Sequence, residues 1–96
     1  METKKRMIDC IGAPAMYELL AEESAELAKA ALKMARVLRQ ENPTPVTLIE
    51  AENMVREEWT DVIQCAEEIN IMIDLDQIEA KQKRFFERWE QHHERE

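Results

Sequence analysis

The stretch LLAEESAELAKAALK, Leu19 to Lys33, decides the fold because strong helix formers coincide there with an apolar repeat. The apolar stripe of this helix comprises Met16, Leu20, Leu27, Ala31, Met34 and Leu38. Successive helical residues turn by about 100°, so Glu23 falls at roughly −20° from Met16, inside the stripe. Glu26 falls at roughly −80°, along its edge. A carboxylate at a core position suggests a functional site.

The composition predicts one small all-α domain. The chain has 96 residues, with one glycine and three prolines, which leaves little turn chemistry for a β-sheet. A chain this short buries only about 60–65% of its unfolded surface. We therefore expect a single all-α domain, residues 1–96, that is stabilised by homo-oligomerisation.

Three helices are expected, each with local signals at its ends. They are predicted at 14–40, 47–73 and 75–94, after an N-terminal segment 1–13. Pro14 fits a first helical turn, and the prolines of ENPTP (41–45) end the first helix. Thr47 with Glu50 three residues later forms a capping box. The stretch DLD, with Asp74 and Asp76, is expected to form the junction before the last helix and its cap.

Charge and cysteine usage restrict the partners. The formal net charge is −8, which argues against nucleic acid or an anionic membrane as a partner. A free nucleotide is also anionic, so binding one requires metal ions or a local basic patch. No apolar run approaches the roughly 18 residues of a membrane-spanning helix. Cys10 and Cys65 form no metal or redox motif, which is typical of a reduced, cytoplasmic protein.

The second helix carries another acidic pair beside its apolar stripe. That stripe comprises Leu48, Ala51, Val55, Trp59, Val62, Ala66, Ile69 and Ile73. Glu58 and Asp61 lie three residues apart and project the same way, between apolar neighbours Met54 and Cys65. One such pair alone is typical of a solvated or ion-paired helix edge. Two pairs on consecutive helices also suit a shared site.

Four carboxylates that face one another repel one another and would destabilise the fold if all were charged and unpaired. Two unit charges about 5 Å apart repel by about 3 kcal/mol at an effective dielectric near 20. The groups must be protonated, point apart or bind a cation. Magnesium suits clustered carboxylates completed by water and phosphates, and manganese is a second candidate. A di-iron site is disfavoured because it requires Glu-x-x-His, and the only histidines are His92 and His93 in the tail.

The motifs EESAE (Glu22 to Glu26) and EEWTD (Glu57 to Asp61) resemble the E-E-x-x-E … E-x-x-D signature of MazG-like nucleotide pyrophosphohydrolases. YELLAEESAELAKAALKMAR, VREEWTDVIQCAEEI and IEAKQKRFFERW are similar to the family's successive helices. The resemblance implies an antiparallel helical bundle whose core is completed by a second subunit, as a homodimer or homotetramer. It also implies hydrolysis of a nucleoside triphosphate to a monophosphate and pyrophosphate, a house-cleaning activity.

The resemblance also implies roles for individual residues. Glu23, Glu26, Glu58 and Asp61 would hold magnesium ions. Glu22, beside the catalytic Glu23, would orient or deprotonate the attacking water.

The last helix carries basic residues that we expect to meet the β- and γ-phosphates. Lys81, Arg84 and Arg88 recur at spacings of three and four, and guanidinium matches phosphate geometry. The alternative is solvation, or pairing with acids such as Glu87 and Glu90. Ile78, Phe85 and Trp89 are predicted to form the packing stripe of this helix.

Base recognition is left unassigned by the sequence. Trp59 is interpreted as a core residue, with base stacking as the alternative, and Tyr17 and Asn70 are weaker candidates. A different functional class also fits the sequence: a non-catalytic helical dimer that uses its apolar faces as a protein-interaction module.

Overall fold

The computed structural model describes residues 5–40 and 45–94, with side chains to residue 93, and all its regular structure is α-helical. The helices are α1 (Met7–Ile11), α2 (Ala13–Arg39), α3 (Leu48–Ile69) and α4 (Leu75–Glu94). The all-α prediction is confirmed, and no strand occurs within the described ranges. Residues 41–44, where the sequence predicted the break before α3, lie outside the described residues.

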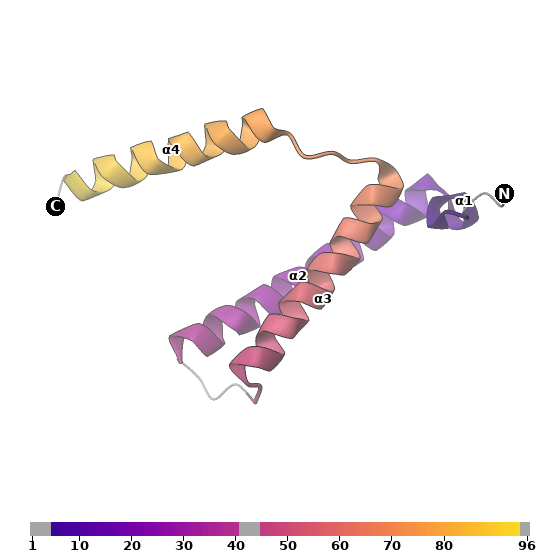
Figure 1. Ribbon diagram of the computed structural model, residues 1–96, viewed down its shortest axis with the longest axis horizontal. Coiled ribbons are helices and arrows are strands. Elements are labelled where there is room, and N and C mark those ends of the chain that lie inside the picture. The colour runs from indigo at the N-terminus through magenta and orange to yellow at the C-terminus, as the bar shows by residue number, and fades with distance from the viewer. Residues whose placement is uncertain (1–4, 41–44, 95–96) are drawn as a thin grey trace.

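Helices α2 and α3 lie side by side as an antiparallel hairpin (Figure 1). Pro14 occupies the first turn of α2, which ends where Gln40 adopts the left-handed conformation with φ 57°. The Gln40 N–H donates to the carbonyl of Arg36 at 3.0 Å. At the start of α3 the Thr47 hydroxyl accepts from the Glu50 N–H at 3.1 Å, as the capping pattern predicts.

Helix α3 ends at Ile69, so the prediction that it continues to residue 73 is wrong. Asn70 adopts a left-handed conformation, with φ 63°, which asparagine tolerates better than most residues. Its N–H donates to the Glu67 carbonyl at 3.2 Å, and the Ile71 N–H donates to the Ala66 carbonyl at 3.0 Å. These bonds satisfy carbonyl groups in the last turn of α3, so the helix ends here and the chain continues toward α4.

The N-terminal segment contains a short helix, α1, that the sequence did not predict. Its Ile8 N–H donates to a Glu68 carboxylate oxygen at 2.9 Å. Arg6 donates to the Glu68 carbonyl at 2.6 Å and forms an ion pair with the Glu68 side chain at 3.7 Å. A cation at the C-terminal end of a helix is electrostatically favourable. Glu68 and Arg6 therefore fasten the start of the chain to the end of α3.

The core of the hairpin is thin. Among the described residues, the fully buried apolar side chains are Met16, Ala30, Ala51 and Cys65, all on α2 or α3. Small side chains at three of these four positions allow the two helix backbones to approach closely. The thin interface leaves the outer faces of both helices exposed to solvent.

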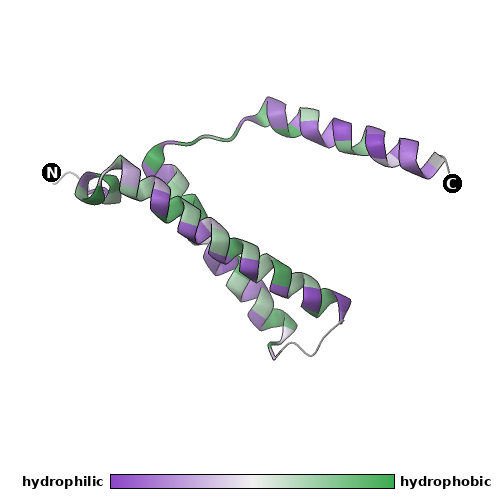
Figure 2. Cartoon of the chain, turned by 180° about the vertical axis from the view of Figure 1, so that it is seen from behind, coloured by the Kyte–Doolittle hydropathy of each residue, from purple (hydrophilic) through white to green (hydrophobic). Residues whose placement is uncertain are grey.

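Helix α4 lies apart from the hairpin and packs against none of the other described helices (Figure 1). The Gln77 N–H donates to the Asp74 carboxylate at 3.0 Å, so Asp74 caps this helix as predicted. Ile78, Phe85 and Trp89 are 52%, 57% and 53% exposed, so the prediction that they pack is wrong for the single chain. Apolar and polar bands alternate along α4 in Figure 2.

The chain is therefore more open than the bundle that the sequence predicted. Its radius of gyration is 18.4 Å, whereas a compact domain of this length has about 12.5 Å. It exposes 8477 Å², whereas a compact protein of its mass exposes about 5700 Å². None of the described helices is both long and apolar enough to span a bilayer.

Candidate functional site

Three carboxylates from the two hairpin helices converge at one place. Glu23 of α2 and the pair Glu58 and Asp61 of α3 offer oxygen atoms that lie within 4.8 Å of one another. All three side chains are half-buried. Glu23 reaches this place because it occupies a core position of α2. The spacing of three residues on α3 turns Glu58 and Asp61 toward the same helix.

The proximity of these groups changes their acidity. Partial burial and the Asp61 charge raise the pKa of Glu23 above 4.5, and a hydrogen bond from protonated Glu23 to Asp61 adds to the rise. Partial burial raises the pKa of Glu58 too, followed by repulsion from Asp61 and Glu23. Both shifts arise because partial burial disfavours the charged form of each carboxyl group, and neighbouring negative charges disfavour it further. Glu23 and Glu58 therefore retain their protons more strongly than isolated carboxylates do.

The other two predicted site residues of α2 lie at the margin of this cluster. Glu26 is exposed and lies outside the group whose oxygens approach within 4.8 Å, although its charge contributes to the raised pKa of Glu23. It lines a groove together with Glu58. Glu22 is exposed, and its charge also contributes to the raised pKa of Glu23.

Cys65 lies buried close to the cluster, one helical turn beyond Asp61. Burial raises the pKa of its thiol, and the charges of Glu23 and Asp61 raise it further. A thiol held in the protonated form is a poor metal ligand. Among the described residues, the side chains that converge here and could hold a metal ion are carboxylates only.

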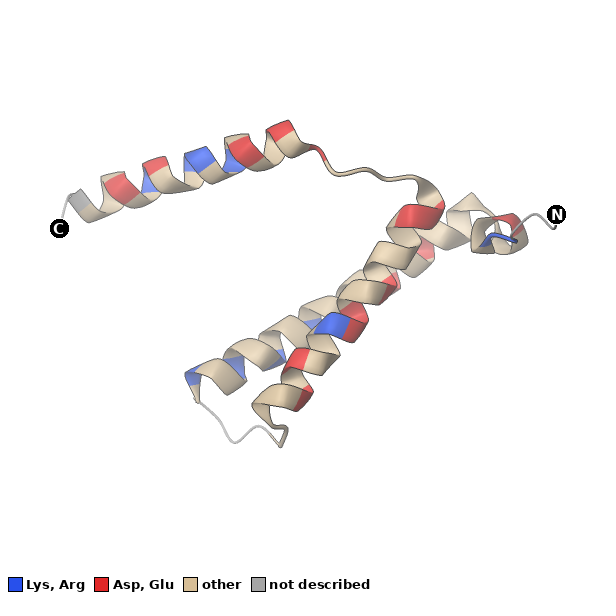
Figure 3. Ribbon diagram, viewed as in Figure 1, with Lys and Arg blue, Asp and Glu red and all other residues tan. Residues whose placement is uncertain are grey.

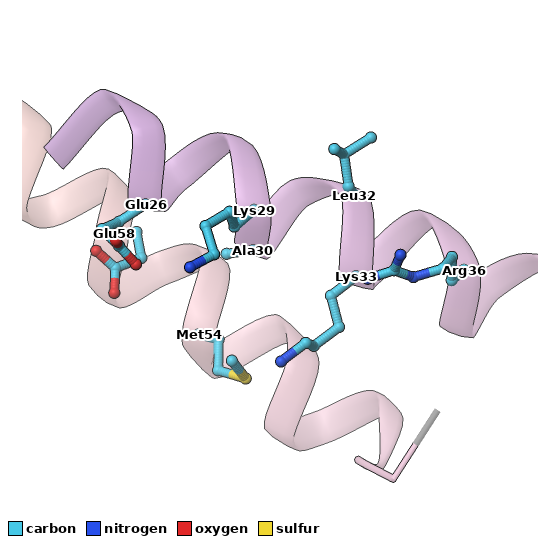
Figure 4. Close-up of a pocket in the computed structure, with 8 residues that line it drawn as sticks. All are labelled: Glu26, Lys29, Ala30, Leu32, Lys33, Arg36, Met54 and Glu58. Carbon is cyan, nitrogen blue, oxygen red and sulfur yellow. The ribbon is translucent and has the colours of Figure 1, made fainter. Parts of the chain in front are cut away.

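A groove with a volume of about 370 Å³ adjoins the carboxylates along the hairpin (Figure 4). Glu26 and Glu58 line one end of the groove. The rest is lined by three cations of α2 and three apolar residues: Lys29, Lys33, Arg36, Ala30, Leu32 and Met54. The sequence analysis did not identify these cations. Their spacing of four and three residues, starting three residues after Glu26, indicates a common face and could have revealed them.

The basic residues predicted on α4 are not near the carboxylates within one chain. Lys81, Arg84 and Arg88 share one face and, with Phe85, line a shallow groove of about 280 Å³. Their common face agrees with the predicted spacing. Because α4 contacts neither α2 nor α3, these cations lie away from the hairpin site of their own chain. Figure 3 shows positive and negative residues intermixed along α4.

The candidate base-contacting residues are on the surface. Trp59 is 52% exposed, so its interpretation as a core residue is wrong. It borders a groove with Met34, Glu52 and Val55 on the hairpin. Tyr17 is 53% exposed, and Asn70 serves as the C-cap of α3. No described contact unites these side chains with the carboxylate cluster.

Comparisons with known proteins give no match to a protein family model, a curated protein or a solved structure. The resemblance to the MazG-like family therefore rests on the acidic motifs and their order along the chain.

Proposed function

We propose that the chain is a magnesium-dependent nucleoside triphosphate pyrophosphohydrolase of the MazG-like type. The observation that carries the proposal is the convergence of Glu23, Glu58 and Asp61 within 4.8 Å. Such a cluster is unfavourable in a marginally stable domain unless a cation or protons neutralise it. The motifs EESAE and EEWTD supply the reaction class by resemblance.

Each acidic residue has a role in this proposal. Glu23, Glu58 and Asp61 hold the metal, and Glu26 completes the site from its exposed position beside Glu58. Glu22 orients or deprotonates the attacking water. Magnesium held by these residues would lower the pKa of that water and would neutralise charge on the phosphoryl oxygens. The hairpin contributes mainly positioning, which is the main protein contribution in phosphoryl transfer.

A second copy of the chain completes the core in this proposal. The surface in excess of a compact protein is about 2,800 Å² per chain, estimated from size scaling. Obligate homodimer interfaces bury about 2,000–5,000 Å² in total. The half-exposed stripe of Ile78, Phe85 and Trp89 on α4 is the apolar surface that such a partner covers. Dimerisation would also allow Lys81, Arg84 and Arg88 to approach a hairpin site.

The test is a pyrophosphate-release assay with a panel of ordinary and modified ribo- and deoxyribonucleoside triphosphates. We expect release from at least one substrate in magnesium or manganese, and none in excess chelator. A complete panel without metal-dependent release would contradict the proposed activity.

The exposed apolar surface favours a second candidate, a non-catalytic helical dimer that acts as a protein-interaction module. A magnesium titration of thermal stability separates the two candidates. At a hundredfold excess over its dissociation constant, a ligand selective for the folded state stabilises it by about 2.7 kcal/mol. A metal site predicts this gain, whereas the interaction module predicts none.

A further inference from the structure

The groove beside the carboxylate cluster has a cationic wall. Lys29, Lys33 and Arg36 line it, and none of them forms an ion pair or a side-chain hydrogen bond with a described residue. Figure 4 shows Lys29 and Lys33 extending from α2 over α3, with Glu26 and Glu58 together at one end and Arg36 at the other. The cations and the acids thus belong to one continuous surface.

This concentration of positive charge is unusual for the chain. Residues 27–39 contain four basic residues and no acidic one, although the whole chain has a net charge of −8. The helix dipole favours cations only within the last turn of a helix. It accounts for Arg36 and Arg39, which lie in that turn of α2, but not for Lys29 or Lys33. Simple solvation would not require these residues to share the groove that holds Glu26 and Glu58.

We propose that Lys29, Lys33 and Arg36 form the polyphosphate-binding wall of the site, within the same chain as the carboxylates. Resting on the proposed function, this assignment places the distal phosphates of the substrate along α2, with the phosphate under attack at the Glu58 end. The rise of an α-helix puts Lys29 and Arg36 about 10 Å apart along the axis. The groove volume of about 370 Å³ lies within the usual range of small-molecule sites, about 300–1,000 Å³.

The cations of this wall lie on a different helix from the basic residues that the sequence analysis predicted to bind phosphate. Lys81, Arg84 and Arg88 lie on α4, which contacts neither hairpin helix. The α2 cations need no second subunit and are carried by the helix that also carries Glu23 and Glu26. Phosphate contacts by α2 therefore act in the same chain.

Calorimetry tests whether these three cations bind polyphosphate. Inorganic tripolyphosphate is titrated into the protein in the presence of magnesium. Each of Lys29→Ala, Lys33→Ala and Arg36→Ala is expected to weaken binding about tenfold, the loss typical of a charge-assisted contact. The matched control is Arg39→Ala, because Arg39 is an exposed cation of α2 outside the groove. Lys33→Arg should restore most of the affinity, and the wild-type affinity should fall with salt more steeply than that of Lys33→Ala.

Nucleotide turnover provides an independent readout. The groove variants should raise KM about tenfold with little change in kcat, the pattern of lost uniform binding. If the three groove variants bind tripolyphosphate as tightly as Arg39→Ala does and have the same KM, the proposed polyphosphate-binding wall is contradicted, even if the protein releases pyrophosphate. If tripolyphosphate binds with the expected variant pattern but no nucleotide is hydrolysed, the wall stands and the proposed reaction fails. Absence of tripolyphosphate binding to the wild-type protein overturns the wall.

Discussion

The α2/α3 hairpin and α4 are both amphipathic, yet they differ in what their apolar residues contact. The hairpin buries Met16, Ala30, Ala51 and Cys65 between its helices, whereas every described side chain of α4 is exposed. Their charges differ as well, because the hairpin brings three carboxylates together and α4 intermixes acids and bases. An amphipathic pattern thus predicts that a face will be covered, but it does not specify the covering surface.

The largest expected effect concerns the hairpin carboxylates, which the proposed activity requires. Glu58→Gln should lower pyrophosphate release by about 100-fold or more, because it removes a ligand whose metal stabilises the transition state by several kcal/mol. Glu52→Gln, an exposed acid of the same helix, is the matched control and should retain activity. Equal activity of the two variants would remove the carboxylate cluster from the mechanism.

The apolar stripe of α4 is tested by its aromatic residues. Phe85 and Trp89 stack with ring centroids 6.2 Å apart, and both are about half exposed. If a second copy covers them, Phe85→Ser should raise the dimer dissociation constant about 30-fold, the effect of losing about 2 kcal/mol at an interface. Lys83→Ser is the control on the same helix. Sedimentation equilibrium measures both, and a wild-type chain that stays monomeric at high concentration would contradict the dimer.

Removing a helix cap should have different effects on stability in the hairpin and in α4. Thr47→Ala should destabilise the hairpin by about 1 kcal/mol and lower its melting temperature by about 4–8 °C. Asp74→Ala removes the corresponding cap of α4, and it should leave hairpin melting unchanged in dilute solution because α4 contacts neither α2 nor α3. Thermal melts at low and high protein concentration provide the measurement. A large loss from Asp74→Ala in the dilute sample would show that α4 stabilises the hairpin of its own chain.

The smallest expected effect is the pH dependence of the metal-free hairpin. The pKa values of Glu23 and Glu58 in the folded protein lie above their ordinary value of 4.5. At a pH between 4.5 and the raised values, the folded protein therefore binds more protons than the unfolded chain. The free energy of unfolding should therefore decrease as pH rises through that window and regain nothing above it. Urea titrations across the window should show a shallower decrease for Glu58→Gln than for Glu52→Gln. Magnesium should counteract the decrease, because a bound cation neutralises the carboxylates after they lose their protons.

Much of the secondary structure could be predicted from the sequence because it depends on neighbouring residues. Pro14, Thr47 and Asp74 lie at helix starts, and each acts through its own backbone or through an N–H within three residues. The end of α3 was missed because Asn70 leaves the helix through its left-handed conformation, although Ile71 to Ile73 continue the apolar pattern. The short α1 was missed because its partner, Glu68, lies 60 residues away.

The sequence by itself determined the three long helices, apart from the end of α3, and placed Glu23, Glu58 and Asp61 on inward-turned faces, because helical periodicity is a local property. Only the tertiary structure decided that these three side chains meet, that Glu26 lies at their margin and that α2 cations line the adjoining groove. It also decided that Trp59 is exposed and that α4 lies apart. The reason is physical: the mutual rotation and separation of packed helices set which side chains meet, and these depend on contacts between residues distant in sequence.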